Sequence, residues 1–373
     1  MKPSELRILI SGGGTGGHVF PAIAIAKAIE RLHPGAIIRF VGAKGRMEME
    51  KVPLAGYQIE GLWISGLQRR LTMQNLLFPI KVLASLWKSW RIVRRFRPDA
   101  AIGVGGYASA PAVYVASRMG VPSLIQEQNA FPGIANRILS KHADLICVAY
   151  EGMEKYFPAS RIRMTGNPVR RDVLDKLDHR TEASMYFGLD AAKPTILSVG
   201  GSLGAKTLNT GMHAMLQSLT NAGYQVVWQT GRAYAAETEH LRNEWKGKGV
   251  CILPFIDRMD LAYAMADLVV SRAGAIAIAE LAAAGKAAIL VPSPHVAEDH
   301  QRKNAEALVA RDAAIMIADQ DAKGQLEAAI LDLAANPARI KTLQDNIQKL
   351  GNQYADETIA RLAIELGKKK GSA

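Results

Sequence analysis

The sequence is poor in cysteine and has no long apolar segment. Only two cysteines, Cys147 and Cys251, occur among the 373 residues, and they lie far apart in apolar, strand-like runs. A fold held together by disulfides is therefore excluded, and a reducing compartment is expected. No stretch of about 18 uncharged apolar residues is present, so we expect no segment that crosses a bilayer. The polar residues 1–5 predict no signal peptide.

Acidic residues are scarce in the first half of the chain. Residues 1–167 contain 22 Lys and Arg but only 10 Asp and Glu, whereas residues 168–373 contain 24 of each. The whole net charge of +12 therefore belongs to the first half. Such an imbalance indicates an anionic partner for that half: nucleic acid, anionic lipid or a phosphorylated substrate.

Strand-like and helix-like stretches alternate along the whole chain. Apolar runs such as residues 6–10 and 195–199 are continuous rather than alternating, which is typical of strands buried on both faces. They predict parallel sheets covered by helices, that is, an α/β fold. A length of 373 residues suits two such domains. We place them at residues 1–167 and 168–373, with the option that the last helix packs back on the first domain.

Two glycine-rich turns stand about half the chain apart, each between a strand-like run and a helix-like stretch. The first covers residues 12–18 (Gly-Gly-Gly-Thr-Gly-Gly-His) and the second residues 200–205 (Gly-Gly-Ser-Leu-Gly-Ala). Such turns lack Cβ atoms, so backbone N–H groups can approach a phosphate or a sugar, and the following helix adds partial positive charge. The pair predicts two similar nucleotide-binding folds that face one cleft.

The first turn contains a formal dinucleotide-binding pattern, Gly12, Gly14 and Gly17, but its acidic partner is missing. The next predicted strand ends at Lys44 without the Asp or Glu that would hold a ribose. We therefore expect no nicotinamide cofactor. His18, at the start of the following helix, is a candidate general base or donor to an acceptor phosphate, the alternative being an ordinary helix-start histidine.

A more specific motif covers residues 272–280. A strand ends at Ser271, and Glu280 is the one acid in a small, apolar helix that begins near Ala275. The helix start could hold a diphosphate, and Glu280 could accept hydrogen bonds from ribose hydroxyls. The alternative for Glu280 is a solvated surface glutamate.

Two clusters of potential metal ligands have the wrong spacing for a metal site. Residues 295–300 contain two histidines and two acids, but they span a loop-to-helix junction without His-x-x-x-His spacing. Residues 319–321 form Asp-Gln-Asp. This pattern is better explained as acids at the start of a helix than as a metal site. We predict no metal. In the first cluster, Gln301 could instead hydrogen-bond sugar hydroxyls.

The segment 61–98 carries eight Lys and Arg and no acid. Lys81, Lys88, Arg91 and Arg95 would share one stripe of a helix, with apolar and aromatic side chains on the opposite side. This combination is typical of a protein that rests on an anionic membrane, the alternative being a packing helix with a basic solvent face. No nucleic-acid-binding module is recognisable, so nucleic acid is not expected as a partner.

Taken together and in this order, these motifs resemble the MurG family of bacterial peptidoglycan glycosyltransferases, which add N-acetylglucosamine (GlcNAc) to lipid I. The matching segments are residues 13–18, 105–107, 127–129, 166–170, 200–202, 255–257, 272–280 and 300–305. The resemblance implies the GT-B fold, two Rossmann-like, doubly wound domains that face a cleft. It also implies an N-terminal domain that binds the acceptor and the membrane, and a C-terminal domain that binds UDP-GlcNAc.

The resemblance implies roles for individual residues as well. Glu280 would hold the ribose and Ile256 the uracil, while Ser202 would touch the phosphates and Gln301 the sugar hydroxyls. Backbone N–H groups at the start of the helix would face the diphosphate, on Ala275, Ile276, Ala277, Ile278 and Ala279, where relatives often carry Ser or Thr. The N-terminal domain would line the same cleft with Thr15, Gly16, Gly17, Asn129 and Arg170. The membrane contacts would be Arg69, Arg70, Leu76, Leu77, Phe78, Lys81, Trp87 and Lys88.

The implied reaction is an inverting transfer of GlcNAc from UDP-GlcNAc to the muramyl 4-hydroxyl of lipid I, which forms lipid II. It would take place at the cytoplasmic face of the bacterial plasma membrane, without cofactor or metal. The implied partners are UDP-GlcNAc, lipid I, the anionic membrane surface and cell-wall synthesis proteins. Two alternatives remain: a glycosyltransferase of the same fold acting on another lipid such as diacylglycerol, and a non-catalytic nucleotide-sugar-binding protein.

Overall fold

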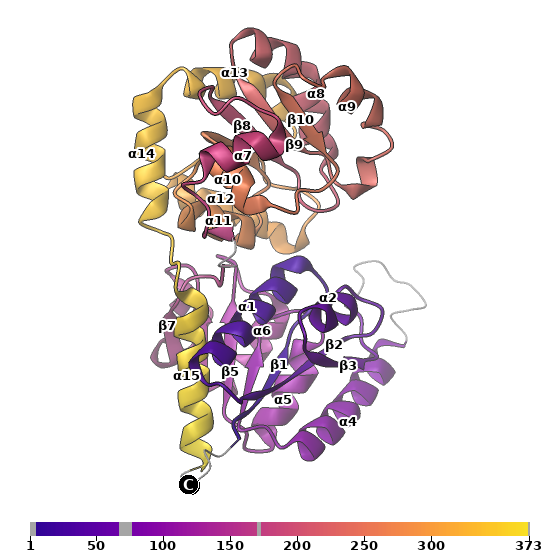
Figure 1. Cartoon of the computed structure of the whole chain (residues 1–373). Helices are drawn as coiled ribbons and strands as arrows, with labels where there is room; N and C mark the ends of the chain where they lie inside the picture. The colour runs from indigo at the N-terminus through magenta and orange to yellow at the C-terminus, as the bar shows by residue number, and fades with distance from the viewer. Residues whose placement is uncertain (1–4, 67–76, 170–172, 372–373) are drawn as a thin grey trace. The chain divides into compact units, whose positions relative to one another are not determined.

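The computed structural model describes residues 5–66, 77–169 and 173–371. These residues divide into two compact units, the first within Met1–Val169 and Gln353–Ala373 and the second within Arg170–Asn352. The C-terminal helix thus belongs with the first unit. The sequence division includes this helix in residues 168–373, with the option that it packs back on the first domain. Each unit contains one sheet with helices on both of its faces (Figure 1).

The first unit is built on a seven-stranded sheet in the order β3-β2-β1-β4-β5-β6-β7, in which every strand pair is parallel. Its strands are β1 (Arg7–Ser11), β2 (Ile37–Ala43), β3 (Gln58–Leu62), β4 (Ala100–Gly103), β5 (Ser123–Glu127), β6 (Leu145–Val148) and β7 (Ile162–Met164). Its helices are α1 (Gly16–Leu32), α2 (Glu48–Leu54), α4 (Phe78–Phe96), α5 (Ser109–Arg118), α6 (Ile134–Leu139) and α15 (Ala355–Gly371).

Alternate residues of β1 enter different layers of the first unit. Ile8 and Ile10 pack with residues of α1 and α15, whereas Leu9 packs with residues of α4 and α5. Arg31 of α1 and Asp356 of α15 add an ion pair at 2.9 Å. The continuous apolar strands are therefore covered on both faces, as the sequence predicts, and α15 supplies part of that cover.

The second unit has a six-stranded parallel sheet in the order β10-β9-β8-β11-β12-β13. Its strands are β8 (Thr195–Val199), β9 (Gln225–Gln229), β10 (Val250–Leu253), β11 (Leu268–Ser271), β12 (Ala287–Leu290) and β13 (Ile315–Met316). Its helices are α7 (Arg180–Phe187), α8 (Lys206–Asn221), α9 (Glu239–Glu244), α10 (Met259–Met265), α11 (Ala275–Ala283), α12 (His300–Val309), α13 (Ala322–Ala334) and α14 (Pro337–Gln348). The predicted α/β class is confirmed in both units.

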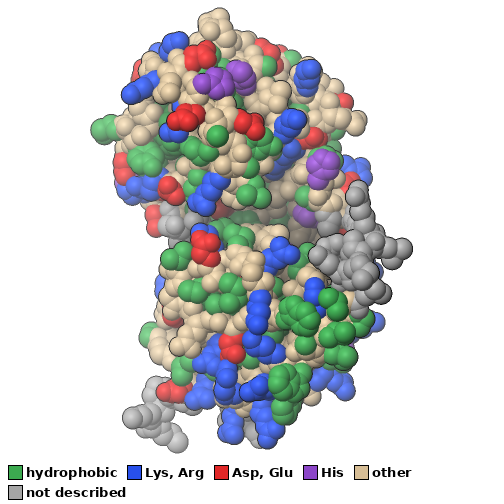
Figure 2. All heavy atoms as spheres, turned by 90° about the vertical axis from the view of Figure 1, so that its right-hand side faces the viewer, with side chains coloured by type: hydrophobic (Ala, Val, Ile, Leu, Met, Phe, Trp, Pro, Cys, Tyr) green, Lys and Arg blue, Asp and Glu red, His purple; other side chains and the backbone are tan. Residues whose placement is uncertain are grey.

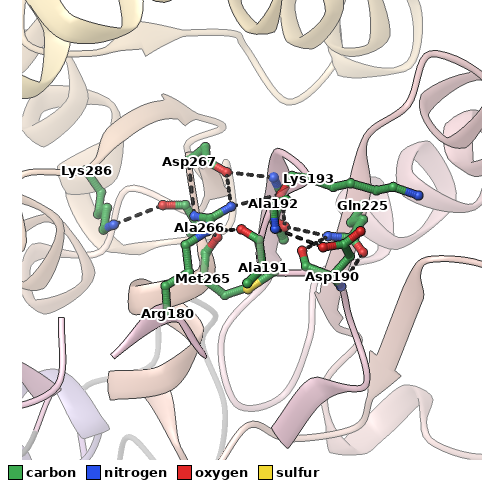
Figure 3. A network of polar contacts seen from close by, with 11 residues as sticks. Arg180, Asp190, Ala191, Ala192, Lys193, Gln225, Met265, Ala266, Asp267 and Lys286 are labelled. Atoms are coloured by element: carbon green, nitrogen blue, oxygen red, sulfur yellow. Dashed lines mark hydrogen bonds and ion pairs between the residues drawn. The ribbon is translucent and has the colours of Figure 1, made fainter. Parts of the chain in front are cut away.

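A polar network fixes the amino ends of the central strands in the second unit (Figure 3). Both terminal nitrogens of Arg180 donate to the carboxylate of Asp267, at 3.1 and 2.9 Å, and that carboxylate accepts the N–H of Thr195 at 2.8 Å. Arg180 also donates to backbone carbonyls, those of Ala191, Lys193 and Met265. The network lies at the end of the sheet opposite to the glycine-rich turn.

Candidate active site

Three loops meet at the carboxyl ends of β1, β4 and β5, which are neighbours in the first sheet. The N–H of Gly13 donates to the carbonyl of Gly105 at 3.3 Å, and the side-chain amide of Gln128 donates to the carbonyl of Val104 at 2.9 Å. Gly106 has φ +83°, and a Cβ atom there would overlap the carbonyl of Gly13. Glycine is therefore required, and the loops form one packed edge.

A buried carboxylate holds the first glycine-rich turn. Glu48 of α2 is fully buried, and its two oxygens accept the N–H groups of Gly14 and Ala43, each at 2.9 Å. A Cβ atom on Gly13 would overlap this carboxylate, so the turn must be glycine at that point. Because Glu48 occupies the N–H of Gly14, that group is not available to a phosphate. The sequence analysis did not identify Glu48 as functional, because its partner in the glycine-rich turn, Gly14, is 34 residues away along the chain.

The start of α1 carries the residues that the resemblance assigns to the first unit. Among the described residues, the N–H groups of Thr15, Gly16 and Gly17 have no hydrogen-bond partner, which is typical of a helix start. The imidazole of half-buried His18 lies against Gly105, and its Nδ1 is 3.2 Å from Oγ1 of Thr15. When Nδ1 carries the proton and donates to Thr15, Nε2 is left as a proton acceptor.

Glu127 anchors the loop that follows β5. Its buried carboxylate accepts the N–H groups of Asn129 at 3.0 Å and Gly133 at 3.1 Å, and the side-chain amide of Asn136 at 2.9 Å. Burial raises the pKa of Glu127, and these hydrogen bonds oppose the rise. The half-buried side chain of Asn129 also donates to Glu127, at 3.2 Å, so this carboxylate orients it. Arg170, assigned to the same site, lies outside the described residues.

In the second unit the glycine-rich turn packs on the loop after β9. A Cβ atom on Gly204 would overlap the carbonyl of Thr230, and the N–H of Arg232 donates to the carbonyl of Ser202 at 3.1 Å. Ser202 is exposed on this turn. Ile256 is buried, and its N–H donates to the side chain of Gln229 at 2.9 Å. The N–H of Ile256 is therefore already bonded within the protein.

Helix α11 begins directly after β11 and has no side-chain cap. Gly274 occupies the N-cap position with extended backbone, and Ala275 follows as the first helical residue. The first helical residues are buried or half-buried, namely Ala275, Ile276, Ala277, Ile278 and Ala279. None of these side chains has a polar group, so the donors of this helix start are backbone N–H groups. The N–H of Ile278 already donates to the carbonyl of Gly274 at 2.9 Å, so the predicted donors Ile278 and Ala279 lie beyond the open end of the helix.

Glu280 is half-buried on α11 and is held by a buried phenol. The hydroxyl of Tyr263 in α10 donates to Oε2 of Glu280 at 3.1 Å, and Tyr263 is only 3% exposed. Glu280 is therefore not a freely solvated surface side chain. Tyr263 gave no signal in the sequence, because only packing of α10 against α11 brings the two residues together.

Gln301 and its helix are tied to the loops after β11 and β12. Oε1 of Gln301 accepts the N–H of Ser293 at 2.9 Å, which leaves its Nε2 as a donor. Asn304, one turn later in α12, is buried and donates to the carbonyl of Ala273 at 3.3 Å. The structure therefore brings Gln301 next to the loop that starts α11.

Asp319, the first residue of the Asp-Gln-Asp motif, makes internal contacts. Asp319 forms an ion pair with Arg272 and accepts a hydrogen bond from the hydroxyl of Thr207 at 2.9 Å. Arg272 also donates to the carbonyl of Val291 at 3.0 Å. Asp319 thus fixes Arg272 at the end of β11, a role that the interpretation as a helix-start acid did not include. Within the described ranges, no three His, Cys, Asp or Glu side chains are grouped closely enough to hold a metal ion.

Helix α4 carries an exposed apolar stripe, which we call the α4 face. Its members are Leu77, Ile80, Leu83, Trp87 and Trp90, exposed by 40% or more. Hydrophobic side chains gather beside Lys and Arg on this side of the first unit (Figure 2). The guanidinium groups of Arg91 and Arg94 lie 4.9 and 5.1 Å from the ring centres of Trp87 and Trp90. The apolar side of the helix therefore faces outward together with arginines.

Three cations of the predicted basic stripe bond to other groups of the protein. Lys81 donates to the hydroxyl of Ser65 at 3.0 Å, and Lys88 donates to the carbonyl of Gly61 at 2.7 Å, while Arg95 pairs with Glu60. These cations turn back to the protein because β3 and the loop after it lie beside them. Phe78 begins α4 and is half-buried. The remaining predicted membrane contacts, Arg69, Arg70 and Leu76, lie outside the described residues.

No helix in the described part of the chain is both long enough and apolar enough to cross a membrane.

Comparisons with known proteins show the family of the chain. Residues 8–148 match the glycosyltransferase family 28 N-terminal domain, and residues 195–359 match the glycosyltransferase family 28 C-terminal domain. A UDP-N-acetylglucosamine–N-acetylmuramyl-(pentapeptide) pyrophosphoryl-undecaprenol N-acetylglucosamine transferase of Cytophaga hutchinsonii is 52% identical over 360 residues, which are 96% of either chain. The Parabacteroides distasonis protein of the same name is 50% identical and covers 98% of this chain and 100% of its own.

Solved structures with the same fold include the MurG of Acinetobacter baumannii. It has a TM-score of 0.77 at 29% identity and covers 96% of this chain and 99% of its own. A UDP-GlcNAc 2-epimerase from Neisseria meningitidis has a TM-score of 0.67 at 15% identity, covers 96% of this chain and 100% of its own, and shares the fold alone. The chain therefore has the GT-B fold and belongs to the MurG family of N-acetylglucosaminyltransferases.

Proposed function

We propose that the chain transfers GlcNAc from UDP-GlcNAc to lipid I and so forms lipid II in peptidoglycan biosynthesis. The observation that carries the proposal is 52% identity, over 96% of the chain, to a relative whose name states this transfer. A binding protein without catalysis is a weaker reading, because relatives that match nearly end to end are named as transferases.

The second unit would bind the donor. N–H groups at the start of α11 would hold the diphosphate, with Ser202 beside it, and Glu280 would accept hydrogen bonds from the ribose. The carbonyl of Ile256 would face uracil, since its N–H donates to Gln229. Nε2 of Gln301 would donate to a sugar hydroxyl, since Oε1 is bonded to Ser293. Fixed N–H donors would stabilise the charge that develops on the departing UDP.

The first unit would bind the acceptor. The muramyl hydroxyl would attack the anomeric carbon while the bond to UDP breaks and its electron pair leaves with UDP. The hydroxyl proton would pass to Nε2 of His18, whose Nδ1 is held by Thr15. The N–H groups of Thr15, Gly16 and Gly17, together with Asn129, would contact substrate in the first unit. Arg170, the first residue of the second unit, would contact substrate as well.

The α4 face would rest on the cytoplasmic surface of the plasma membrane, where lipid I is available. Outward apolar side chains next to Arg91 and Arg94 support this role, as does the positive charge of the first half. Replacing Trp87 and Trp90 with serine should release the protein from vesicles that contain phosphatidylglycerol. Replacing Lys88 with glutamine should change little, since this ammonium is bonded to Gly61. Salt-independent vesicle binding by the unaltered protein would contradict the electrostatic part.

The decisive experiment is an assay of UDP release with UDP-GlcNAc and a short-chain lipid I analogue. Release should require the analogue and should not occur with diacylglycerol or without acceptor. Release with diacylglycerol but not with the analogue would favour a different lipid glycosyltransferase. Binding of UDP-GlcNAc without release under any condition would favour a non-catalytic protein.

A further inference from the structure

One buried side chain joins two loops of the second unit that carry proposed donor contacts. Gln229 is the last residue of β9 and is 3% exposed. Its Nε2 donates to the carbonyl of Gly201 at 2.9 Å, and its Oε1 accepts the N–H of Ile256 at 2.9 Å. Both ends of the amide are thus bonded to the backbone of different loops, and Gly201 directly precedes Ser202.

We propose that Gln229 is a positioning residue for the donor, which sets the spacing between the glycine-rich turn and the segment at Ile256. The inference rests on the proposed function, in which the first of these loops contacts phosphate and the second contacts uracil. A nucleotide spans both groups with a fixed length, so a change in their spacing weakens its binding without touching the reacting atoms. Small displacements of such supporting groups commonly reduce affinity or rate.

The chemistry of the amide explains why glutamine suits this position. One donor must meet the carbonyl of Gly201 and one acceptor must meet the N–H of Ile256, and an amide supplies both without charge. A glutamate would place a second acceptor against the carbonyl and would bury a charge. A methionine would match the length but would leave the N–H of buried Ile256 unpaired, which is costly. It would also remove one of two hydrogen bonds to the carbonyl of Gly201, which accepts the N–H of Gly204 at 3.1 Å as well.

The same strand provides a matched control at its other end. Gln225 is the first residue of β9, lies on the same face as Gln229, and is 4% exposed. Its side chain also bridges two backbone groups: Oε1 accepts the N–H of Asp190 and Nε2 donates to the carbonyl of Asp190, each at 2.8 Å (Figure 3). The loop at Asp190 carries no proposed substrate contact. Gln225 therefore matches Gln229 in residue type, strand and burial, and it too has one backbone donor and one backbone acceptor as partners. It differs in location, and both of its backbone partners belong to one residue rather than to two loops.

The test compares Gln229→Met with Gln225→Met in the full chain. Both variants should lower the midpoint of thermal unfolding, because each removes two hydrogen bonds between a buried side chain and the backbone. Only Gln229→Met should raise the KM for UDP-GlcNAc, by about tenfold, which corresponds to the loss of roughly one buried hydrogen bond. The KM of Gln229→Met for the lipid I analogue should stay within about twofold of the value for the unaltered protein. Calorimetric titration with UDP should show the same loss of affinity for Gln229→Met alone.

Several outcomes would overturn the inference. The inference fails if the KM of Gln229→Met for UDP-GlcNAc stays within about twofold of the value for the unaltered protein. It also fails if Gln225→Met raises this KM as much as Gln229→Met does. Gln229→Asn, which is one methylene shorter, replaces Gln229→Met if the latter does not fold. Failure of both position-229 variants to fold, while Gln225→Met folds, would assign Gln229 a purely structural role. Titration with UDP needs no acceptor, so the inference can be tested even if the transfer assay fails.

Discussion

The two glycine-rich turns look alike in sequence, yet the protein holds them by opposite chemistry. In the first unit a buried carboxylate, Glu48, accepts the N–H of Gly14. In the second unit a buried neutral amide, Gln229, donates to the carbonyl of Gly201. A carboxylate beneath the first turn disfavours an anion at that point, whereas the side chain that supports the second turn is neutral. The comparison supports the proposal that phosphate lies beside the second turn and not beside Gly14.

The largest expected difference between the two units is the effect of replacing His18. Because His18→Ala removes the proposed proton acceptor, we expect kcat to fall by about 10²–10⁴-fold. The affinity for UDP should not change, since the donor contacts are assigned to the second unit. Transfer assays and UDP titration on the same preparation measure both quantities. A near-normal rate for His18→Ala would exclude it as the base.

The carboxylate beneath the first turn can be neutralised without changing its size. Glu48→Gln would set an N–H₂ group against one of two backbone N–H donors, with a cost of about 1–3 kcal/mol in stability. The turn that leads to His18 should shift, so kcat should fall by about tenfold while UDP affinity stays unchanged. Thermal unfolding, transfer assays and UDP titration provide the measurements.

Glu50→Gln is the control for this change. It alters the same residue type in the same helix, but Glu50 has an exposed side chain paired with Lys51. An equal loss of rate in both variants would show that the location of Glu48 is irrelevant.

A change at Tyr263 tests the donor contacts proposed for the second unit. Tyr263→Phe removes the hydroxyl that holds Glu280 and should raise the KM for UDP-GlcNAc by about threefold to tenfold, the value of one hydrogen bond. The KM for the lipid I analogue should not rise in this variant. Glu280→Ala should raise the donor KM further, and an equal rise in both KM values would argue against a donor-specific role.

The smallest expected effect is a pH dependence specific to the first unit. Burial raises the pKa of Glu127, so the folded chain binds its proton more tightly than the unfolded chain. Between the unfolded pKa and the raised folded pKa, the free energy of unfolding therefore falls as pH rises. Glu127→Gln should flatten this part of the profile, measured by denaturant titration. An identical slope in the variant would show that Glu127 does not contribute.

The sequence was most informative where a residue's role depends on its immediate neighbours. Continuous apolar runs predicted the parallel strands, and glycines between strand and helix marked both turns. Patterns could not reveal Glu48, Gln229 or Tyr263, because each bonds a group that only folding brings near. The basic stripe of α4 was predicted, but the inward bonds of Lys81 and Lys88 depend on the position of β3.

The sequence by itself determined the α/β class, the places of the two glycine-rich turns and the membership of the MurG family, because these follow from local periodicity and from motif order. Tertiary structure alone decided which buried group supports each turn and that the C-terminal helix returns to the first unit. The physical reason is that buried backbone N–H and carbonyl groups must find partners, and in these loops the partners come from distant parts of the chain.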